Sequence, residues 1–419
     1  MVEQVSDAPI ADVLIAGGGY VGLTTAVALA HEAPHLNVVL VDAAPEGAPL
    51  DDVRASAVAA AAVRMLERLG LWEELSRNAQ PITEMIVTDS RVSDPARPVF
   101  LTFGGDRDAG AGEPFAHMVS NKQLVGGLRE AAREKGVELV FGRKVEDFRD
   151  TGPHMEVTLD DGTVRRTRLL AAADGVRSKL RDAAGIRTIR VPYEQMGLVT
   201  TVSHERDHFG RAEEHFMPPG PFAILPVRAP DGSGTRSSLV WTETRKVAER
   251  LLKADDFTFE LELERRFGRH LGAIEVIGKR AAYPLGLTLA RDFVRPRLAL
   301  VGDAAHGIHP IAGQGLNLGF KDAAALAQVV VEADRLGLDV GALDVLERYQ
   351  RWRRFDTVQM GVVTDVLNRL FSNDSSVLRM ARTFGLGVVD RLPRLKRQFI
   401  DQAAGRGPST PNLLRGLPI

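Results

Sequence analysis

The 419-residue chain contains no cysteine, which excludes disulfide bonds, thiolate metal sites and a cysteine nucleophile. It also has little net charge: with 53 basic and 55 acidic side chains, the net charge is −2. The protein therefore lacks the overall positive charge that would favour nucleic acid as a partner. No apolar run is long enough for a membrane-spanning helix, and the polar segment 1–9 does not have the pattern of a secretory signal. We therefore expect a cytoplasmic protein, and a peripheral contact with a membrane surface stays open.

A glycine-rich turn near the N-terminus carries the first positive signal. The apolar run Ala11–Ala16 predicts a strand, and it leads into Gly17-Gly-Gly-Tyr-Val-Gly22, which opens a helix over 23–31. A second strand over 37–41 ends at Asp42. This is the G-x-G-x-x-G arrangement of a dinucleotide site, in which the glycines admit a pyrophosphate and the acid accepts hydrogen bonds from a ribose. The pattern predicts dinucleotide binding through Gly17, Gly19, Gly22 and Asp42.

A second glycine-rich segment lies far along the chain. Leu298–Val301 predicts a short buried strand, Asp303 follows in a turn, and a long helix is expected over 315–333. The start of a helix exposes unpaired N–H groups and the positive end of the helix dipole. Because Gly313 and Gly315 have no side chains, a flat anionic group such as the edge of a reduced flavin could approach those N–H groups.

Three more polar residues are candidates from their positions alone. Arg54 precedes a predicted helix and could reach a pyrophosphate with its planar fork. Gln123 lies near the start of a helix over 121–135, and Asp174 belongs to an Ala-Asp-Gly turn after a strand over 168–172. Residues 186–290 contain β-rich runs broken by proline and glycine, with one helix over 256–267, and we interpret them as an antiparallel sheet in a second domain.

Together, Gly17–Gly22, Ala173-Asp174-Gly175 and Gly302-Asp303 resemble the aromatic flavoprotein monooxygenases of the para-hydroxybenzoate hydroxylase fold. Three segments resemble more narrowly the ubiquinone-biosynthesis hydroxylases of that group: Ala304–Gly319, Gly220–Pro226 and Leu367–Ser372. The resemblance implies an α/β fold with a Rossmann-like FAD-binding domain, an interleaved antiparallel substrate domain and C-terminal helices. The expected FAD-binding domain comprises 1–80, 115–185 and 291–345, the substrate domain 81–114 and 186–290, and the helical region 346–419.

The resemblance also assigns roles to single residues. Pro310, Gly313 and Gly315 would face the flavin ring as the catalytic loop. FAD would be bound by a larger set: Gly17, Gly19, Gly22, Asp42, Arg54, Gln123, Asp174, Asp303, Gly313, Gln314, Gly315 and Asn317. Phe222, Ile224, Leu225 and Pro226 are candidates to line the ring pocket, and because a strand alternates, either Phe222 with Ile224 or Ala223 with Leu225 would do so. The alternative is that they are plain core of the sheet. Independently of the resemblance, His306 and His309 are interpreted as residues that stabilise the loop by hydrogen bonds, and no metal site is expected.

By resemblance, NADH or NADPH would reduce bound FAD, and the reduced flavin would react with O2 to give a C4a-hydroperoxide that hydroxylates a phenol. A polyprenylated phenol of ubiquinone biosynthesis is the implied substrate. A soluble aromatic substrate and a non-catalytic flavin-binding assembly protein are the alternatives. The apolar and basic pattern of 362–400 predicts either a helical cap or a docking face for a membrane or for other quinone-biosynthesis proteins. The ring position, the tail length and the oligomeric state stay open.

Overall fold

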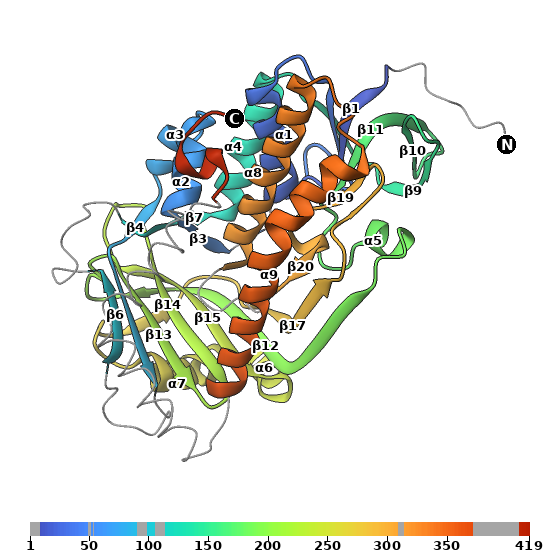
Figure 1. Cartoon of the computed structure of the whole chain (residues 1–419). Coiled ribbons are helices and arrows are strands. Elements are labelled where there is room, and N and C mark those ends of the chain that lie inside the picture. Colours follow the sequence, from blue (N-terminus) through green and yellow to red (C-terminus); the bar gives the residue numbers. More distant parts are fainter. Residues whose placement is uncertain are drawn as a thin grey trace.

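The computed structural model describes residues 9–48, 52, 54–89, 99–104, 114–308, 314–371 and 410–419. Two large sheets lie side by side, with long helices packed mainly against the first (Figure 1). His309, Pro310 and Gly313 lie outside the described residues, as does the predicted helical segment 378–400.

The first sheet has a parallel core that the N-terminal motif enters directly. Its order is β18 (Val294–Arg295), β19 (Leu298–Leu300), β11 (Val164–Ala172), β1 (Ala11–Ala16), β2 (Val38–Asp42) and β8 (Glu138–Phe141). Strands β19, β11, β1, β2 and β8 run parallel, whereas β9 (Val145–Asp150) and β10 (Met155–Leu159) extend β11 as an antiparallel ribbon. β1, β2, β19 and the C-terminal half of β11 are largely apolar because both faces of the sheet are buried there, whereas β8 at the edge is not buried.

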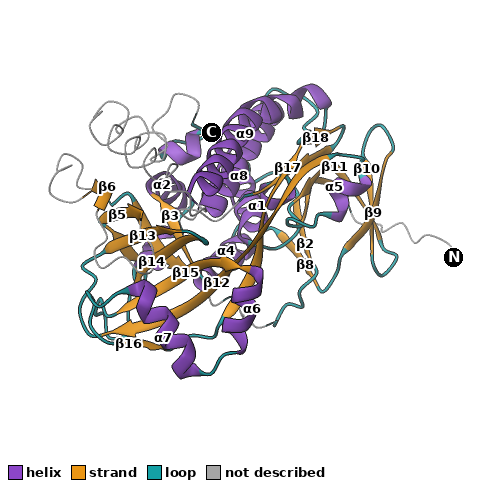
Figure 2. Cartoon of the chain, turned by 90° about the horizontal axis from the view of Figure 1, so that it is seen from below, coloured by secondary structure: helices purple, strands orange, loops and turns teal. Residues whose placement is uncertain are grey.

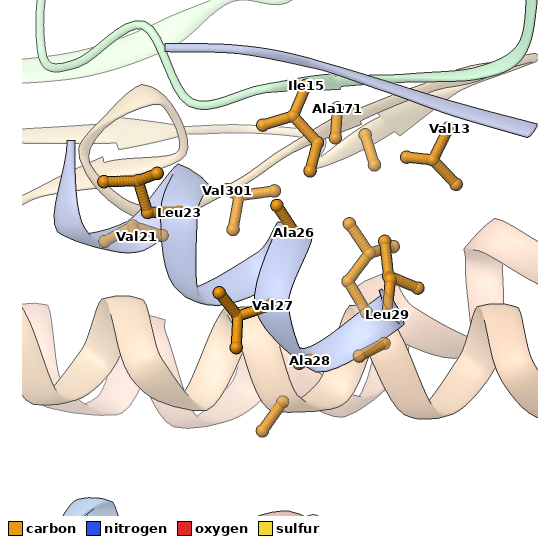
Figure 3. Close-up of a cluster of buried hydrophobic side chains, with 14 of the residues drawn as sticks. Val13, Ile15, Val21, Leu23, Ala26, Val27, Ala28, Leu29, Ala171 and Val301 are labelled. Carbon is orange, nitrogen blue, oxygen red and sulfur yellow. The ribbon is translucent and has the colours of Figure 1, made fainter. Parts of the chain in front are cut away.

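Helix α1 (Tyr20–Glu32) packs between the sheet, α4 (Asn121–Glu134) and α8 (Gln314–Arg335). Its apolar side chains interlock with those of β1, β11 and the segment after β19 (Figure 3). α1 and α8 approach closely because Gly319 has no side chain: a Cβ there would lie 2.4 Å from Val21. This crossing brings the start of α8 close to the turn that precedes α1.

The second sheet is mostly antiparallel. Its order is β20 (His306–Gly307), β17 (Ala281–Ala290), β12 (Thr188–His204), β15 (Arg236–Thr244), β14 (Gly220–Val227), β13 (Arg211–Met217), β5 (Glu84–Asp89) and β6 (Val99–Gly104), and β16 (Ile274–Val276) pairs with β12. A small sheet, β3 (Ala55–Ala59), β7 (Ala116–Ser120) and β4 (Gln80–Ile82), lies between the two large sheets. Figure 2 shows α6 (Arg245–Lys253) and α7 (Asp256–Phe267) along the second sheet. The sequence predicted α7 but missed α6, whose Ala248 and Leu251 are buried.

The remaining helices complete the layer around the first sheet. They are α2 (Ala60–Arg68), α3 (Trp72–Ser76), α5 (Lys179–Ala183) and α9 (Leu343–Phe371), with short 3₁₀ turns at Gly302–Ala304 and Asn412–Arg415. In the C-terminal turn, Leu413 and Leu414 are buried against the core. Within the described ranges, no helix combines the length and apolar character needed to cross a bilayer. β20 joins the second sheet although 291–345 was expected in the FAD-binding domain, and the domain boundaries stay a prediction.

Candidate functional site

The turn between β1 and α1 is built so that only glycine fits at two of its positions. Gly17 has φ +118°, and a Cβ there would lie 2.3 Å from the carbonyl oxygen of Ala173. A Cβ on Gly22 would lie 2.0 Å from the carbonyl oxygen of Gly17. Gly19, in contrast, faces open space. The first and third glycines therefore allow the turn and its packing, and the second leaves room for a ligand to approach the backbone.

The start of α1 is free to bind an anion. Gly19 is its N-cap, no side chain caps the helix, and the first turn carries no acid. The first N–H groups of a helix have no intrahelical partner, and the helix dipole adds positive potential there. A pyrophosphate placed over Gly19 would meet these donors.

Asp42 lies directly beside this turn, at the end of β2. A Cβ on Gly18 would lie 2.3 Å from the Asp42 Oδ2 atom, so the carboxylate occupies the space that a side chain would need. The backbone N–H of Ala44 donates to Oδ1 over 3.2 Å, and Arg129 Nη2 donates to Oδ2 over 3.4 Å. The carboxylate is held where a ribose bound beyond the turn would be.

Arg54 lies between the first sheet and the second. Its Nε and Nη2 donate to the two oxygens of Asp52 over 2.7 Å each, and its guanidinium lies 5.1 Å from the ring centre of Tyr283 on β17. These hydrogen bonds raise the pKa of Arg54. Burial alone would raise the pKa of Asp52, but hydrogen bonds from Arg54 and Asn121 hold it below its ordinary value. Arg54 is thus a fixed cation next to the expected cofactor site.

The position of Gln123 does not favour its predicted contact with FAD. Gln123 is exposed and lines a groove of about 290 Å³ between α3 and α4, together with Glu74 and Glu130. Asn121, two residues earlier, is buried instead, and its Nδ2 donates to Asp52 over 2.9 Å. Two positions on a helix differ by about 200° in direction, so Gln123 points away from the side that Asn121 faces. Sequence analysis missed Asn121.

Asp303 lies in the 3₁₀ turn after β19. Its side chain is exposed to solvent, and desolvation by the surrounding protein raises the pKa of its carboxyl. Burial and the nearby Asp303 carboxylate also raise the pKa of Tyr20, at the start of α1. The turn requires φ +62° at Gly302, where a Cβ would press on Val21 at 3.1 Å. Asp303 is therefore open to a ligand hydroxyl next to the first glycine turn.

Asp174 follows β11 and retains hydrogen-bonding capacity. Its Oδ2 accepts from the backbone N–H of Leu180 over 3.3 Å. Its Oδ1 is buried and has no partner within the described part of the chain. Buried polar atoms without a partner are rare and call for an explanation. A ligand hydroxyl or N–H group at this edge of the sheet would satisfy it.

The start of α8 was expected to face the flavin ring. Gly315 faces open space, as that role requires. Asn317 instead ties α8 to β3: its Oδ1 accepts from Ala59 N over 2.9 Å, and its Nδ2 donates to the Ala57 carbonyl over 2.8 Å. Gln314 begins α8, but its side chain is outside the description, like Pro310 and Gly313. The two hydrogen bonds of Asn317 hold the start of α8 against β3. A contact between Asn317 and FAD stays a prediction.

The substrate candidates on β14 are divided between two faces of the second sheet. Phe222 and Ile224 are fully buried with Leu251 and Phe259 of α6 and α7, and Pro226 shares their side of the strand. Leu225 points to the other face, where it packs against the small sheet. This placement corrects the expectation for Phe222, Ile224 and Pro226, because helices already cover their face. The other face, with Ala223 and Leu225, is only partly covered, by the small sheet and by α9, and we call it the open face. Tyr283 on this face lies next to the Arg54 guanidinium.

Comparison with known proteins agrees with this geometry. The model of the family described as FAD binding domain matches residues 10–354. The chain is 45% identical to ubiquinone hydroxylase UbiL of Rhodospirillum rubrum, covering 98% of this chain and 94% of that protein. It is 31% identical to the mouse mitochondrial ubiquinone biosynthesis monooxygenase COQ6, covering 93% and 90%.

Solved structures show the same fold. p-Nitrophenol 4-monooxygenase PnpA from Pseudomonas putida superposes with a TM-score of 0.75 at 20% identity, covering 94% of this chain and 97% of that one. PqsL from Pseudomonas aeruginosa, in complex with 2-aminobenzoylacetate, gives 0.73 at 24% identity, covering 90% and 100%.

The chain therefore belongs to the family with the FAD binding domain, and the predicted α/β fold is confirmed. More particularly, it is an FAD-dependent monooxygenase of the aromatic-hydroxylase type, as the resemblance predicted. The residues present fit FAD: among the described residues, no atom fills the space at Gly19 and Gly315, Asp42 lies beside the glycine turn, and Asp174 has a buried oxygen without a partner. No group of metal-ligating side chains occurs among the described residues.

Proposed function

We propose that this protein hydroxylates the ring of a polyprenylated phenol in ubiquinone biosynthesis, with FAD as bound cofactor and NADH or NADPH and O2 as co-substrates. Two relatives named for ubiquinone biosynthesis, which match nearly the whole chain, support the pathway. When bound, FAD would supply electron transfer from the nicotinamide and the activation of O2.

The observation that carries the substrate class is the open face of the second sheet. Five apolar side chains on its central strands are only half-buried: Val199, Ala223, Leu225, Val240 and Ala281. Between 197–199, 223–225, 238–242 and 281–283, no residue on this face is charged, and on the neighbouring strand β13 the buried acid Glu214 lies opposite Ala223. An aromatic acid would need a cation to replace its lost hydration, whereas an uncharged ring with an apolar tail would not. The face suits a neutral phenol.

The protein's own groups would position the cofactor against this face. Gly19 and the start of α1 would receive the pyrophosphate, Asp42 a ribose and Asp303 the ribityl chain. Tyr283 extends from the open face towards Arg54, so the two regions meet there. Pro310 and Gly313, as the loop facing the flavin ring, stay predictions, and the N–H groups at Gly315 would stabilise negative charge on that ring.

Docking to a membrane or to other quinone-biosynthesis proteins remains part of the proposal. α9 carries four exposed apolar side chains at helical spacing: Phe355, Val358, Val362 and Val366. They form an apolar stripe that overlaps the start of 362–400, the segment for which the sequence predicted a helical cap or a docking face. Such a stripe is compatible with peripheral attachment.

Lipid extracts from cells lacking this gene test the pathway. Mass spectrometry should show accumulation of a prenylated phenol short of one oxygen, and complementation with the wild-type gene should remove it. If ubiquinone is unchanged in a strain that also lacks redundant hydroxylases, the pathway assignment fails. Turnover of small phenols by the purified protein would then favour a soluble aromatic substrate.

The assembly-protein alternative makes a different prediction. A Gly315→Val variant that is saturated with FAD should lose oxygen-dependent turnover, because its side chain fills the space above the helix start. If cells with this variant still made ubiquinone at the wild-type rate, a non-catalytic role would be favoured.

A further inference from the structure

One buried carboxylate holds the turn that carries Asp303. Asp322, on α8, is completely buried. Its Oδ2 accepts hydrogen bonds from Gly302 N over 2.9 Å and from His306 Nε2 over 2.5 Å. Its Oδ1 accepts from Arg353 Nε over 2.7 Å. A single side chain therefore contacts the residue before Asp303, the residue three positions after it, and α9.

These contacts fix both ends of a strained turn. Gly302 has φ +62°, and its N–H points to Asp322. His306 is buried at the start of β20, where the chain joins the second sheet. Asp303 between them is exposed, so the backbone on either side determines where its carboxylate lies.

His306 and Arg353 surround Asp322 and favour the charged form of its carboxyl. Burial alone would raise the pKa of Asp322, but His306 and Arg353 hold it below its ordinary value. Burial lowers and Asp322 raises the pKa of Arg353, and the net change is upward. Removing the carboxylate charge would leave the buried Arg353 cation without its main partner, and such a change costs far more than losing an exposed ion pair.

α9 is attached to the same turn along one side. Arg353 Nη1 also donates to Asp356 over 2.9 Å, and one turn earlier the Tyr349 hydroxyl donates to the Leu300 carbonyl over 2.8 Å. Farther along α9, Asp365 accepts from the Tyr193 hydroxyl of β12 over 2.7 Å. α9 thus connects the Asp303 turn to the second sheet, with Asp322 at the junction.

We propose that Asp322 is a positioning residue: through Gly302 and His306 it orients the Asp303 turn for FAD, and through Arg353 it couples that turn to α9. This inference rests on the assignment of Asp303 to the ribityl chain. It makes no use of the substrate assignment, so it can fail or hold independently of ubiquinone chemistry.

The test compares two buried carboxylates in the full-length protein. Asp322→Asn removes the charge of Asp322, whereas Glu243→Gln removes a carboxylate of similar burial that binds Arg266 Nη2 over 2.9 Å on the α7 side of β15. For each variant, the FAD dissociation constant of FAD-depleted protein, the visible circular dichroism of bound FAD and the melting temperature are measured. We expect both variants to lose stability, and only Asp322→Asn to bind FAD at least about tenfold more weakly, which corresponds to about 1.4 kcal/mol, with an altered spectrum.

A second pair decides the matter if Asp322→Asn does not fold. His306→Gln keeps a donor for Asp322, and His306→Leu removes it while leaving the pair with Arg353. FAD affinity should be near wild type in the first and weakened in the second. Wild-type affinity and spectrum in His306→Leu, or in a folded Asp322→Asn, would overturn the positioning role. Unchanged affinity in Asp303→Ala would show instead that the assignment of Asp303 is wrong.

Discussion

The two faces of the second sheet are built from the same strands but differ in how they are covered. On the closed face, Phe222 and Trp241 pack edge-to-face at 5.9 Å between ring centres, and α6 and α7 bury them. On the open face, Ala223 and Val240 occupy the adjacent positions and remain half-buried. Large side chains thus make the core on one side, and small ones leave room for a ligand on the other. We infer that the closed face provides stability and the open face receives substrate.

Breaking the closed face should have the largest effect. Phe222→Ala removes a fully buried ring and leaves a cavity among Ile224, Trp241 and Phe259. The free energy of unfolding should fall by about 3–5 kcal/mol. Chemical denaturation of the FAD-bound protein measures this loss. A loss below about 1 kcal/mol would mean that Phe222 is not part of the core.

Filling the open face should affect activity more than stability. Ala223→Phe places a ring where the substrate is expected, and kcat/KM should fall by about tenfold or more, about 1.4 kcal/mol. The melting temperature and the FAD affinity should stay near wild type. Ala223→Ser, which adds little volume, serves as the control. Equal turnover in the Phe and Ser variants would place the substrate elsewhere.

Acid should weaken the closed face through Glu213, which lies beside His215 and His270 at 3.2 and 2.9 Å. Burial alone would raise the pKa of Glu213, but hydrogen bonds from these histidines lower it from 4.5 to about 2. The charged form therefore stabilises the fold fully above pH 4.5, and this contribution is lost as the pH falls towards 2. Unfolding measured across this range should depend less steeply on pH in Glu213→Gln, and equal slopes would exclude this contribution.

The smallest effect is expected on the outer side of the helices that cover the closed face. Phe257 on α7 is 78% exposed. Phe257→Ser should change the free energy of unfolding by no more than about 0.5 kcal/mol. Thermal unfolding of this variant, measured beside Phe222→Ala, should show that the burial of a ring, and not its aromatic character, stabilises the closed face. A destabilisation comparable with that of Phe222→Ala would mean that another surface covers Phe257.

The sequence predicted well those features that local spacing determines. The glycine turn, Asp42 and Asp303 follow from strand–turn–helix patterns, and the structure brings them together. Alternation along β14 defined two possible faces, but only the packing of α6 and α7 shows which one is closed. α6 itself was missed.

Residues whose role depends on a distant partner were also missed. Asn121 meets Asp52 across 69 positions, and Asp322 meets Arg353 across 31. Neither pairing has a local sequence signature, because the tertiary fold creates both. Gln123 was a candidate from its place near the start of α4, because the sequence does not show which side of that helix faces Asp52.

Isotope labelling gives the most direct test of the central claim. The purified protein, supplied with FAD, NADH or NADPH and a prenylated phenol, is incubated under ¹⁸O2, and the product is analysed by mass spectrometry. We predict one ¹⁸O atom in the ring of the prenylated phenol, and none without the nicotinamide. A protein that is saturated with FAD and oxidises the nicotinamide, yet leaves the prenylated phenol unlabelled while labelling a small soluble phenol, would contradict the proposed function.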